Sequence, residues 1–120
     1  MMRDFQQLEF WQRSHKLTLQ VYYLTKSFPK EETYGLISQM RRSASSVSTN
    51  IAEGCGRNSS AELKRFLVIA AGSTSELQYQ FILSKDLGYI TESIFKELFD
   101  EISQVRKMIY SYCERLKADS

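Results

Sequence analysis

Apolar residues recur every three or four positions along this chain, the spacing that places side chains on one side of an α-helix. Four stretches follow the rule, at residues 8–27, 33–54, 60–87 and 92–117. In the second stretch the apolar positions step by 3, 4, 3 and 4 residues, a heptad seam made of Ile37, Met40, Ala44, Val47 and Ile51. No stretch shows the alternation of a β-strand bounded by turn residues. The pattern therefore predicts an all-α protein.

Helix-ending and helix-starting residues fall between these stretches. Pro29 closes the first, because the residue before a proline disfavours the helical conformation. Gly54 and Gly56 are expected to end the second by adopting the left-handed conformation. Ser59 and Glu62 form a capping box at the start of the third.

The third stretch is expected to end at Gly88, and Thr91 to cap the fourth. The connections are short, and short connections make consecutive helices antiparallel neighbours. Residues 1–120 are thus expected to form a single domain, an up-down-up-down four-helix bundle about 30–40 Å long.

Size and composition fit this fold and exclude several classes. The chain has 120 residues, 42% of them hydrophobic and 25% charged, which suits one globular domain. No apolar run approaches the roughly 20 residues that a membrane span needs. The first ten residues contain Asp4 and Glu9 and no unbroken apolar stretch, so they do not resemble a signal peptide. We expect a cytoplasmic protein in which Cys55 and Cys113 stay reduced.

The second stretch is rich in small polar side chains, namely Ser43, Ser45, Ser46, Ser48 and Thr49. Serine and threonine have only middling helix propensity, but their low bulk lets a neighbouring helix approach closely. The third stretch offers similar small residues. Close packing of the two helices is the first interpretation, and contact of exposed hydroxyls with phosphate is the second.

Four polar residues lie close to the apolar seams and are predicted to form a structural polar network: Asn50, Glu53, Ser73 and Glu76. A buried carboxylate is costly unless it is paired. Arg41, Arg42 or Arg57 could supply the partner, and Glu53 and Arg57 have the favourable i, i+4 spacing. The network is expected inside the bundle or at a contact between subunits.

The formal net charge is only +2, but cations gather between residues 41 and 65. The candidate nucleic-acid-binding residues are Arg41, Arg42, Arg57, Lys64 and Arg65. Such a cluster can contact phosphates. The alternative is a solvated helix surface whose charges pair with Glu62 and with the acidic start of the fourth helix. The window from Glu92 to Glu101 is correspondingly acidic.

Candidate chemistry is sparse, and we expect no enzymatic activity, metal or cofactor. A di-metal bundle supplies Glu-x-x-His motifs, and the single histidine, His15, is not in one. A cysteine nucleophile would need Cys55 or Cys113 beside His15. Catalysis by carboxylates would require Glu53, Glu76 and His15 to converge in one pocket.

Several motifs taken together resemble those of a known family. They are WQ at Trp11 and Gln12, FPKEE followed by YGL, QMRR, NIAEG with GR from Asn50 to Arg57, GS with a glutamate at Gly72, Ser73 and Glu76, and LGYI from Leu87 to Ile90. Over about residues 5–112 the chain resembles the bacterial four-helix-bundle proteins called 23S rRNA intervening-sequence proteins. One departure is Ser46-Val47-Ser48-Thr49-Asn50, where the family often has SIPSN.

The resemblance implies an antiparallel bundle that assembles into a ring-shaped homo-oligomer, with five subunits. A related group, the accessory proteins of diversity-generating retroelements, forms similar rings and binds nucleic acid with a basic surface. We therefore expect a non-catalytic, ring-forming helical bundle that binds RNA or DNA weakly through its basic residues. The alternative is a structural ring that binds another protein and no nucleic acid.

Overall fold

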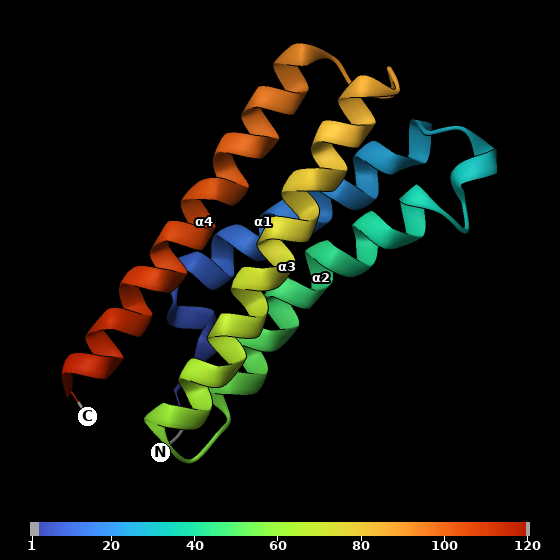
Figure 1. The fold of residues 1–120 in the computed structure, drawn as a ribbon. Helices are drawn as coiled ribbons and strands as arrows, with labels where there is room; N and C mark the ends of the chain where they lie inside the picture. Colours follow the sequence, from blue (N-terminus) through green and yellow to red (C-terminus); the bar gives the residue numbers. More distant parts are fainter. Residues whose placement is uncertain (1–2, 120) are drawn as a thin grey trace.

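The protein folds into four long helices, as the sequence pattern predicts. The computed structural model describes residues 3–119, and in that part of the chain it contains no strand. The helices are α1 (Glu9–Leu24), α2 (Leu36–Cys55), α3 (Ser60–Asp86) and α4 (Glu92–Asp119) (Figure 1). Short 3₁₀ turns occupy Phe5–Gln7, Thr25–Ser27 and Lys30–Glu32.

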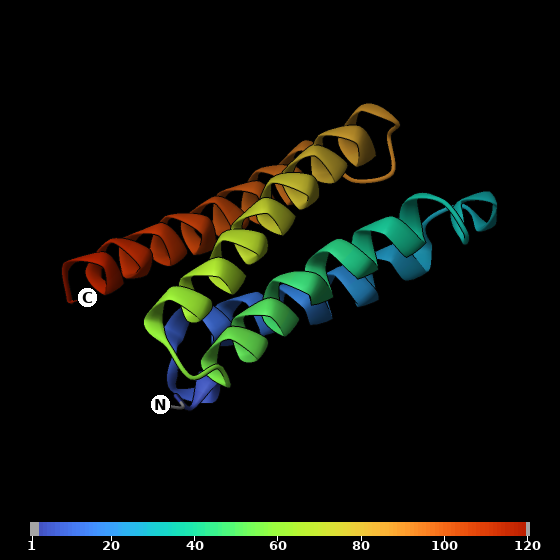
Figure 2. The same ribbon diagram turned by 60° about the horizontal axis from the view of Figure 1, so that its bottom comes forward.

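The helices form an elongated antiparallel bundle of 47 × 23 × 20 Å. Each packs on its sequence neighbours, and α1 also packs on α4, which closes the bundle. The α1–α2 and α3–α4 connections lie at one end, and the α2–α3 turn lies at the other, near both termini (Figure 1). Figure 2 shows the α1–α2 pair and the α3–α4 pair spreading apart toward the first of these ends. The predicted up-down-up-down topology is confirmed.

The predicted caps of α3 and α4 are present. Ser59 accepts a hydrogen bond from the backbone N–H of Glu62 at 3.1 Å, and Thr91 accepts one from Ile94 at 3.1 Å. Gly88 has φ +80° and ends α3 in a Schellman arrangement, with the N–H of Tyr89 donating to the carbonyl of Ser84 at 2.9 Å.

The expectation for the end of α2 is wrong in its mechanism. α2 runs through Gly54 to Cys55, and Gly88 is the one glycine in the described residues with positive φ. Gly54 serves packing instead, because a Cβ there would lie 3.0 Å from both Leu63 Cδ1 and Phe66 Cβ. At the other end, α2 begins at Leu36 rather than residue 33. The 3₁₀ turn Lys30–Glu32 follows Pro29 and delays the start of the helix. The Glu32 carboxylate then accepts a hydrogen bond from the Leu36 N–H at 3.2 Å.

The heptad seams meet along the axis and form a continuous core. The seam of α2 is almost fully buried and meets a similar seam from α3. Largest among the fully buried side chains are Phe81, Leu17, Met40, Ile51, Leu63 and Leu67. Ser43, Ser73 and Ala70 are also buried, and Ser46 contacts Ser73 across α2 and α3, as the first interpretation of the serine run predicts for these positions. Ser48 instead hydrogen-bonds to Ser14 of α1, and Thr49 is exposed.

Candidate functional site

The five predicted basic residues fall into two groups. Arg41 and Arg42 lie in the first half of α2, whereas Arg57, Lys64 and Arg65 lie around the α2–α3 turn. Arg57 lies sixteen positions after Arg41, so at the helical rise the groups are about 24 Å apart. The two groups thus lie toward opposite ends of α2, and each has a different setting.

Arg41 is held in place by the end of α1. Its Nε donates to Thr25 Oγ1 at 3.0 Å, its Nη2 donates to the carbonyl of Tyr22 at 3.2 Å, and its guanidinium lies 4.7 Å from the centre of the Tyr22 ring. The threonine hydroxyl in turn donates to the carbonyl of Val21 at 2.8 Å. Arg41 thus joins α1 to α2 while keeping its charge near the surface.

Arg42 stands beside Arg41 and is exposed. No hydrogen bond or ion pair to its guanidinium occurs within residues 3–119. Both arginines line a surface cleft of about 420 Å³ together with Tyr22, Tyr34 and Ser45. Tyr34 is 97% exposed. Cations with aromatic rings between them are the side chains that bind unpaired nucleotides, the ring stacking on a base and the cation meeting a phosphate.

The second basic group is organised around Phe66. The guanidiniums of Arg57 and Arg65 each lie 4.7 Å from the centre of this ring. Arg57 pairs with Glu53 at 2.8 Å, as the i, i+4 spacing predicts, and Arg65 pairs with Glu62 at 3.2 Å. These two charges are therefore partly neutralised within the chain.

Lys64 completes the second group and is half-buried. It faces the C-terminal part of α4, where its charge opposes the rise that burial produces in the pKa of the Cys113 thiol. The acidic start of α4 lies at the opposite end of the bundle, so it does not pair with this group (Figure 1).

The structure brings together only half of the predicted polar network. The hydroxyls of Ser46 and Ser73 meet across α2 and α3 at 2.9 Å, and Asn50 Nδ2 donates to Ser46 Oγ at 3.0 Å. Glu53 and Glu76 are exposed on the surface of the subunit and do not join them. Of the two expected positions, the interior of the bundle is therefore excluded for these carboxylates, Glu53 turning outward to Arg57, whereas a contact between subunits stays a prediction.

Beside this serine pair, α2 and α3 enclose a polar cleft of about 460 Å³. Its lining residues are Gln39, Arg42, Ser43, Ser46, Glu76 and Gln80. Gln80 is 8% exposed, and its Oε1 atom is buried without a hydrogen-bond partner. Arg42 thus lies between two clefts of different character, one aromatic and one polar.

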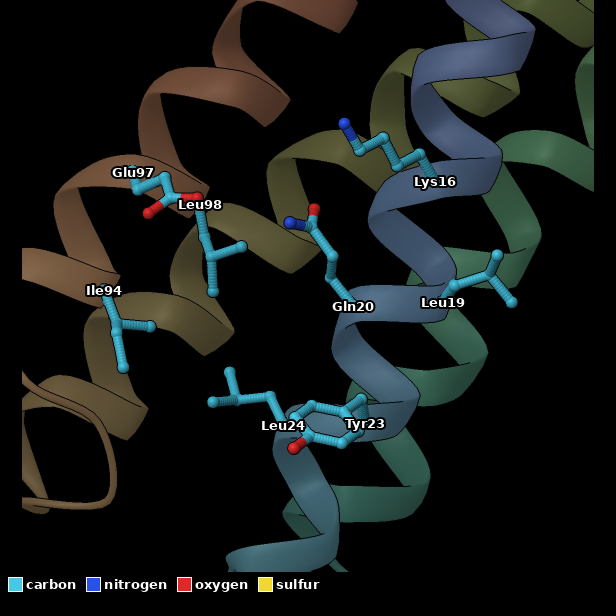
Figure 3. Close-up of a pocket in the computed structure, with 8 residues that line it drawn as sticks. All are labelled: Lys16, Leu19, Gln20, Tyr23, Leu24, Ile94, Glu97 and Leu98. Atoms are coloured by element: carbon cyan, nitrogen blue, oxygen red, sulfur yellow. The ribbon is translucent and has the colours of Figure 1, made fainter.

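A third concave surface is apolar and lies between α1 and α4. Its volume is about 400 Å³, and it is lined by Lys16, Leu19, Gln20, Tyr23, Leu24, Ile94, Glu97 and Leu98 (Figure 3). Leu19 and Tyr23 are 57% and 78% exposed. Figure 3 shows Leu24, Ile94 and Leu98 directed into the space between the two helices. We call this surface the α1–α4 groove.

One ion pair crosses the bundle next to the groove. Arg13 of α1 donates to both carboxylate oxygens of Glu101 of α4, at 2.8 and 2.7 Å. This bidentate pair lowers the pKa of the Glu101 carboxyl, chiefly through the hydrogen bonds from Arg13, and raises the pKa of Arg13. It fixes α1 against α4, where the helix pair has few other contacts.

The candidate nucleophiles are not assembled into a catalytic group. Cys55 and Cys113 are buried, and burial raises the pKa of both thiols. His15 is exposed and stacks on Trp11 at 5.1 Å. Within the described residues no three His, Cys, Asp or Glu side chains gather so as to hold a metal ion.

Sequence reasoning did not single out Tyr22 and Tyr34 as neighbours of the arginine pair. Tyr22 belongs to α1, and Tyr34 lies in the connection before α2, so only the folded α1–α2 pair brings them to Arg41 and Arg42. The one available signal was the short connection itself, which obliges the end of α1 and the start of α2 to be adjacent.

Comparison with known proteins agrees with this architecture. A solved structure from Bacteroides thetaiotaomicron, a protein of unknown function from the S23 ribosomal protein family, superposes with a TM-score of 0.78 at 20% sequence identity. The alignment covers 87% of this chain and 97% of that one. No curated protein matches the chain. None of the helices in residues 3–119 combines the length and apolarity that a membrane crossing requires.

The fold therefore defines a four-helix bundle of the type found in that bacterial structure. The sequence of residues 6–111 matches the family described as 23S rRNA-intervening sequence protein. The chain belongs to this family, and the resemblance inferred from its motifs is confirmed. Neither the family's description nor the neighbour's names a catalytic activity.

Proposed function

We propose that the protein is a non-catalytic homo-oligomer whose subunits assemble into a ring, with five subunits as the family resemblance implies. The observation that carries this proposal is apolar surface left open on different sides of one subunit. The α1–α4 groove exposes Leu19 and Tyr23, and the outer side of α3 exposes Val68 and Tyr79. Large exposed apolar surfaces mark sites of association in soluble proteins.

The test is the mass of the native protein in solution. Light scattering and native mass spectrometry over a wide concentration range should give a multiple of 14.0 kDa, with five copies as the expected multiple. A monomer at every concentration would overturn the proposal. A mass that drifts upward without a plateau would contradict a closed ring, since an open contact produces filaments.

A second proposed role is weak binding of RNA or DNA in the cytoplasm through Arg41, Arg42, Arg57, Lys64 and Arg65. The specific observation in its favour is the cleft where Arg41 and Arg42 stand beside Tyr22 and Tyr34. Arg57 and Arg65 are paired with carboxylates, so Arg42 and Lys64 supply more of the available charge. A ring would repeat this modest charge around its axis and strengthen a contact that is weak in one subunit.

Fluorescence anisotropy with labelled single-stranded and duplex oligonucleotides tests the second role. Affinity should fall steeply as salt rises, because phosphate contacts release counterions. Arg42→Glu should weaken binding strongly, whereas Lys107→Glu, an equal change of charge at an exposed position of α4, should weaken it little. Equal losses in the two variants, or affinity independent of salt, would contradict the assigned surface.

The alternative is a structural ring that binds another protein and no nucleic acid. The α1–α4 groove favours it, because an apolar groove of this size suits a helix or a nonpolar segment. The nucleic-acid-binding ring and the protein-binding ring differ in which surface the assembled oligomer leaves exposed. A groove that stays open in the oligomer, together with failure to bind oligonucleotides at low salt, would favour the protein-binding ring.

A further inference from the structure

Gly72 is placed where nothing within the described subunit explains a glycine. It lies near the middle of the 27-residue helix α3, is exposed, and has helical backbone geometry. A Cβ at this position would meet no atom within 4 Å. Glycine is among the poorest helix formers, so an unneeded glycine at mid-helix weakens α3. Gly54 shows the contrast, since its missing Cβ lets α3 approach α2.

The surface around Gly72 carries four exposed apolar side chains, with Ser75 and Glu76 exposed between them. Val68 and Ile69 lie one turn before it, and Tyr79 and Ile82 lie two and three turns after it, all on the side of α3 that faces away from the core. Val68 is 48% exposed and Tyr79 is 60% exposed. The opposite side of α3 is already buried in the bundle. We call this surface, from Val68 to Ile82, the α3 stripe; it is about 21 Å long at the helical rise.

A helix that is apolar on both sides is normally covered on both sides. A missing side chain in the middle of the uncovered side leaves a shallow depression between larger residues. Such a depression lets the backbone of α3 come close to an approaching side chain or helix, as small residues do at helix crossings. The glycine therefore has a physical use only when another molecule lies against the α3 stripe.

The same chain carries a surface of matching character, the α1–α4 groove. The groove is concave, with Leu24, Ile94 and Leu98 at its base, and Tyr23 stands at its margin (Figure 3). A ridge with a central depression fits a groove with a projecting ring. The charges at the two surfaces also allow pairing, since Lys16 and Glu97 line the groove and Glu76 is exposed within the stripe. Arg65, which pairs with Glu62 in the subunit, lies about one turn before Val68.

We propose that the α3 stripe around Gly72 of one copy seats in the α1–α4 groove of a second copy. The inference rests on the proposed self-association and names the surfaces that make it. The two surfaces are different and lie on different helices, so the contact is head-to-tail. A head-to-tail contact leaves one free stripe and one free groove after each addition, and a suitable rotation closes the series into a ring.

Two blocking variants test the contact. Gly72→Gln places a long side chain on the stripe, and the double change Leu19→Glu and Tyr23→Glu places charge in the groove. All three residues are exposed, so each variant should keep the helical circular dichroism and cooperative melting of a folded subunit. Each alone should lose the oligomer and run as a monomer. Ser111→Gln, an exposed change on α4 outside both surfaces, should assemble as the wild type does.

The decisive measurement is the mixture of the two blocked proteins. Each retains one intact surface, so the stripe of the groove variant should seat in the groove of the Gly72 variant and form a heterodimer and nothing larger. Sedimentation of the mixture at high protein concentration detects it. Gly72→Ala should give an intermediate result, an association roughly tenfold weaker, because one methyl group overpacks a close contact.

Other outcomes would overturn the inference in distinguishable ways. A groove variant that assembles normally while Gly72→Gln does not would point to stripe-on-stripe contact. Two monomeric variants that stay monomeric when mixed would show that the surfaces do not bind each other. A wild-type protein that is monomeric throughout would overturn the proposed assembly as well, whereas oligomeric Gly72→Gln would leave the assembly standing and remove this interface.

Discussion

The hydroxyl oxygens of Ser46 and Ser73 lie 2.9 Å apart, one from α2 and one from α3. A contact this short between two side chains as small as serine requires close approach of the helix backbones. Neighbouring small or apolar residues on both helices, among them Ala44 and Ala70, are buried beside it. The serine-rich part of α2 is therefore first of all a packing surface, and its phosphate-binding interpretation applies only to hydroxyls that remain exposed.

This close approach predicts that volume, more than polarity, decides which residue position 73 tolerates. Ser73→Leu should destabilise the subunit by about 1–3 kcal/mol, because the added atoms force α2 and α3 apart. Ser73→Ala should cost about 1 kcal/mol through the lost hydrogen bond. Urea unfolding followed by circular dichroism measures both. Ser111→Leu, at an exposed site, is the control, and equal effects at the two sites would contradict tight packing.

Two glycines predict opposite responses to the same substitution. Gly54→Ala should destabilise the subunit by about 1–2 kcal/mol, since the new Cβ presses on Leu63 and Phe66, outweighing the better helix propensity. Gly72→Ala should stabilise the isolated subunit by about 1 kcal/mol, because its Cβ enters open space. Thermal melting of subunits held monomeric by the groove variant separates this effect from assembly. If the two substitutions changed the melting temperature in the same direction, the proposed difference between Gly54 and Gly72 would be wrong.

The Arg13–Glu101 pair predicts a stability difference that depends on pH. Arg13 lowers the pKa of Glu101 below its ordinary value of 4.5, so the folded state favours the ionised carboxylate. Its stabilisation is fully present above that ordinary value and is lost as pH falls through the lowered one. Glu101→Gln should cost about 1 kcal/mol at pH 7, since the pair is bidentate but one-third exposed.

Chemical unfolding of both proteins from neutral to strongly acidic pH tests this dependence. The difference between wild type and Glu101→Gln should shrink toward zero at the acid end. Glu9→Gln removes the more exposed carboxylate that also contacts Arg13 and serves as the control, with a smaller effect at every pH. A difference that is constant with pH would show that Glu101 does not act through its charge.

The two thiols predict slow reaction with thiol reagents in the folded protein. Cys55 and Cys113 are 1% and 3% exposed, and burial raises the pKa of each, which reduces the reactive thiolate. At mildly alkaline pH, an aromatic disulfide reagent should label neither residue rapidly until denaturant is added, after which both should react. Rapid labelling of one residue under native conditions would show local opening at that end of the bundle.

Most of the fold could be predicted from the local pattern of apolar and capping residues. The seam from Ile37 to Ile51 and the caps at Ser59 and Thr91 placed the helices to within a few residues, because helical periodicity and capping depend on neighbours in sequence. The end of α2 was predicted to within one residue, but the role of Gly54 there was misjudged, since glycine can end a helix or let one pack closely, and only the position of α3 decides between the two. The ion pair between Arg57 and Glu53 could be predicted for the same local reason, because the two residues are one helical turn apart.

The candidate surfaces depended on contacts between residues far apart in the chain. That Tyr34 lies beside Arg42, that Arg13 reaches Glu101, and that Glu76 stays outside the bundle all follow from how the helices are rotated about their axes and cross. By itself the sequence determined four helices, their order and their family, because those follow from spacing along one chain. The tertiary structure alone decided which side chains share a cleft and which apolar residues remain uncovered, because helix rotation and crossing are set by the packing of the whole core.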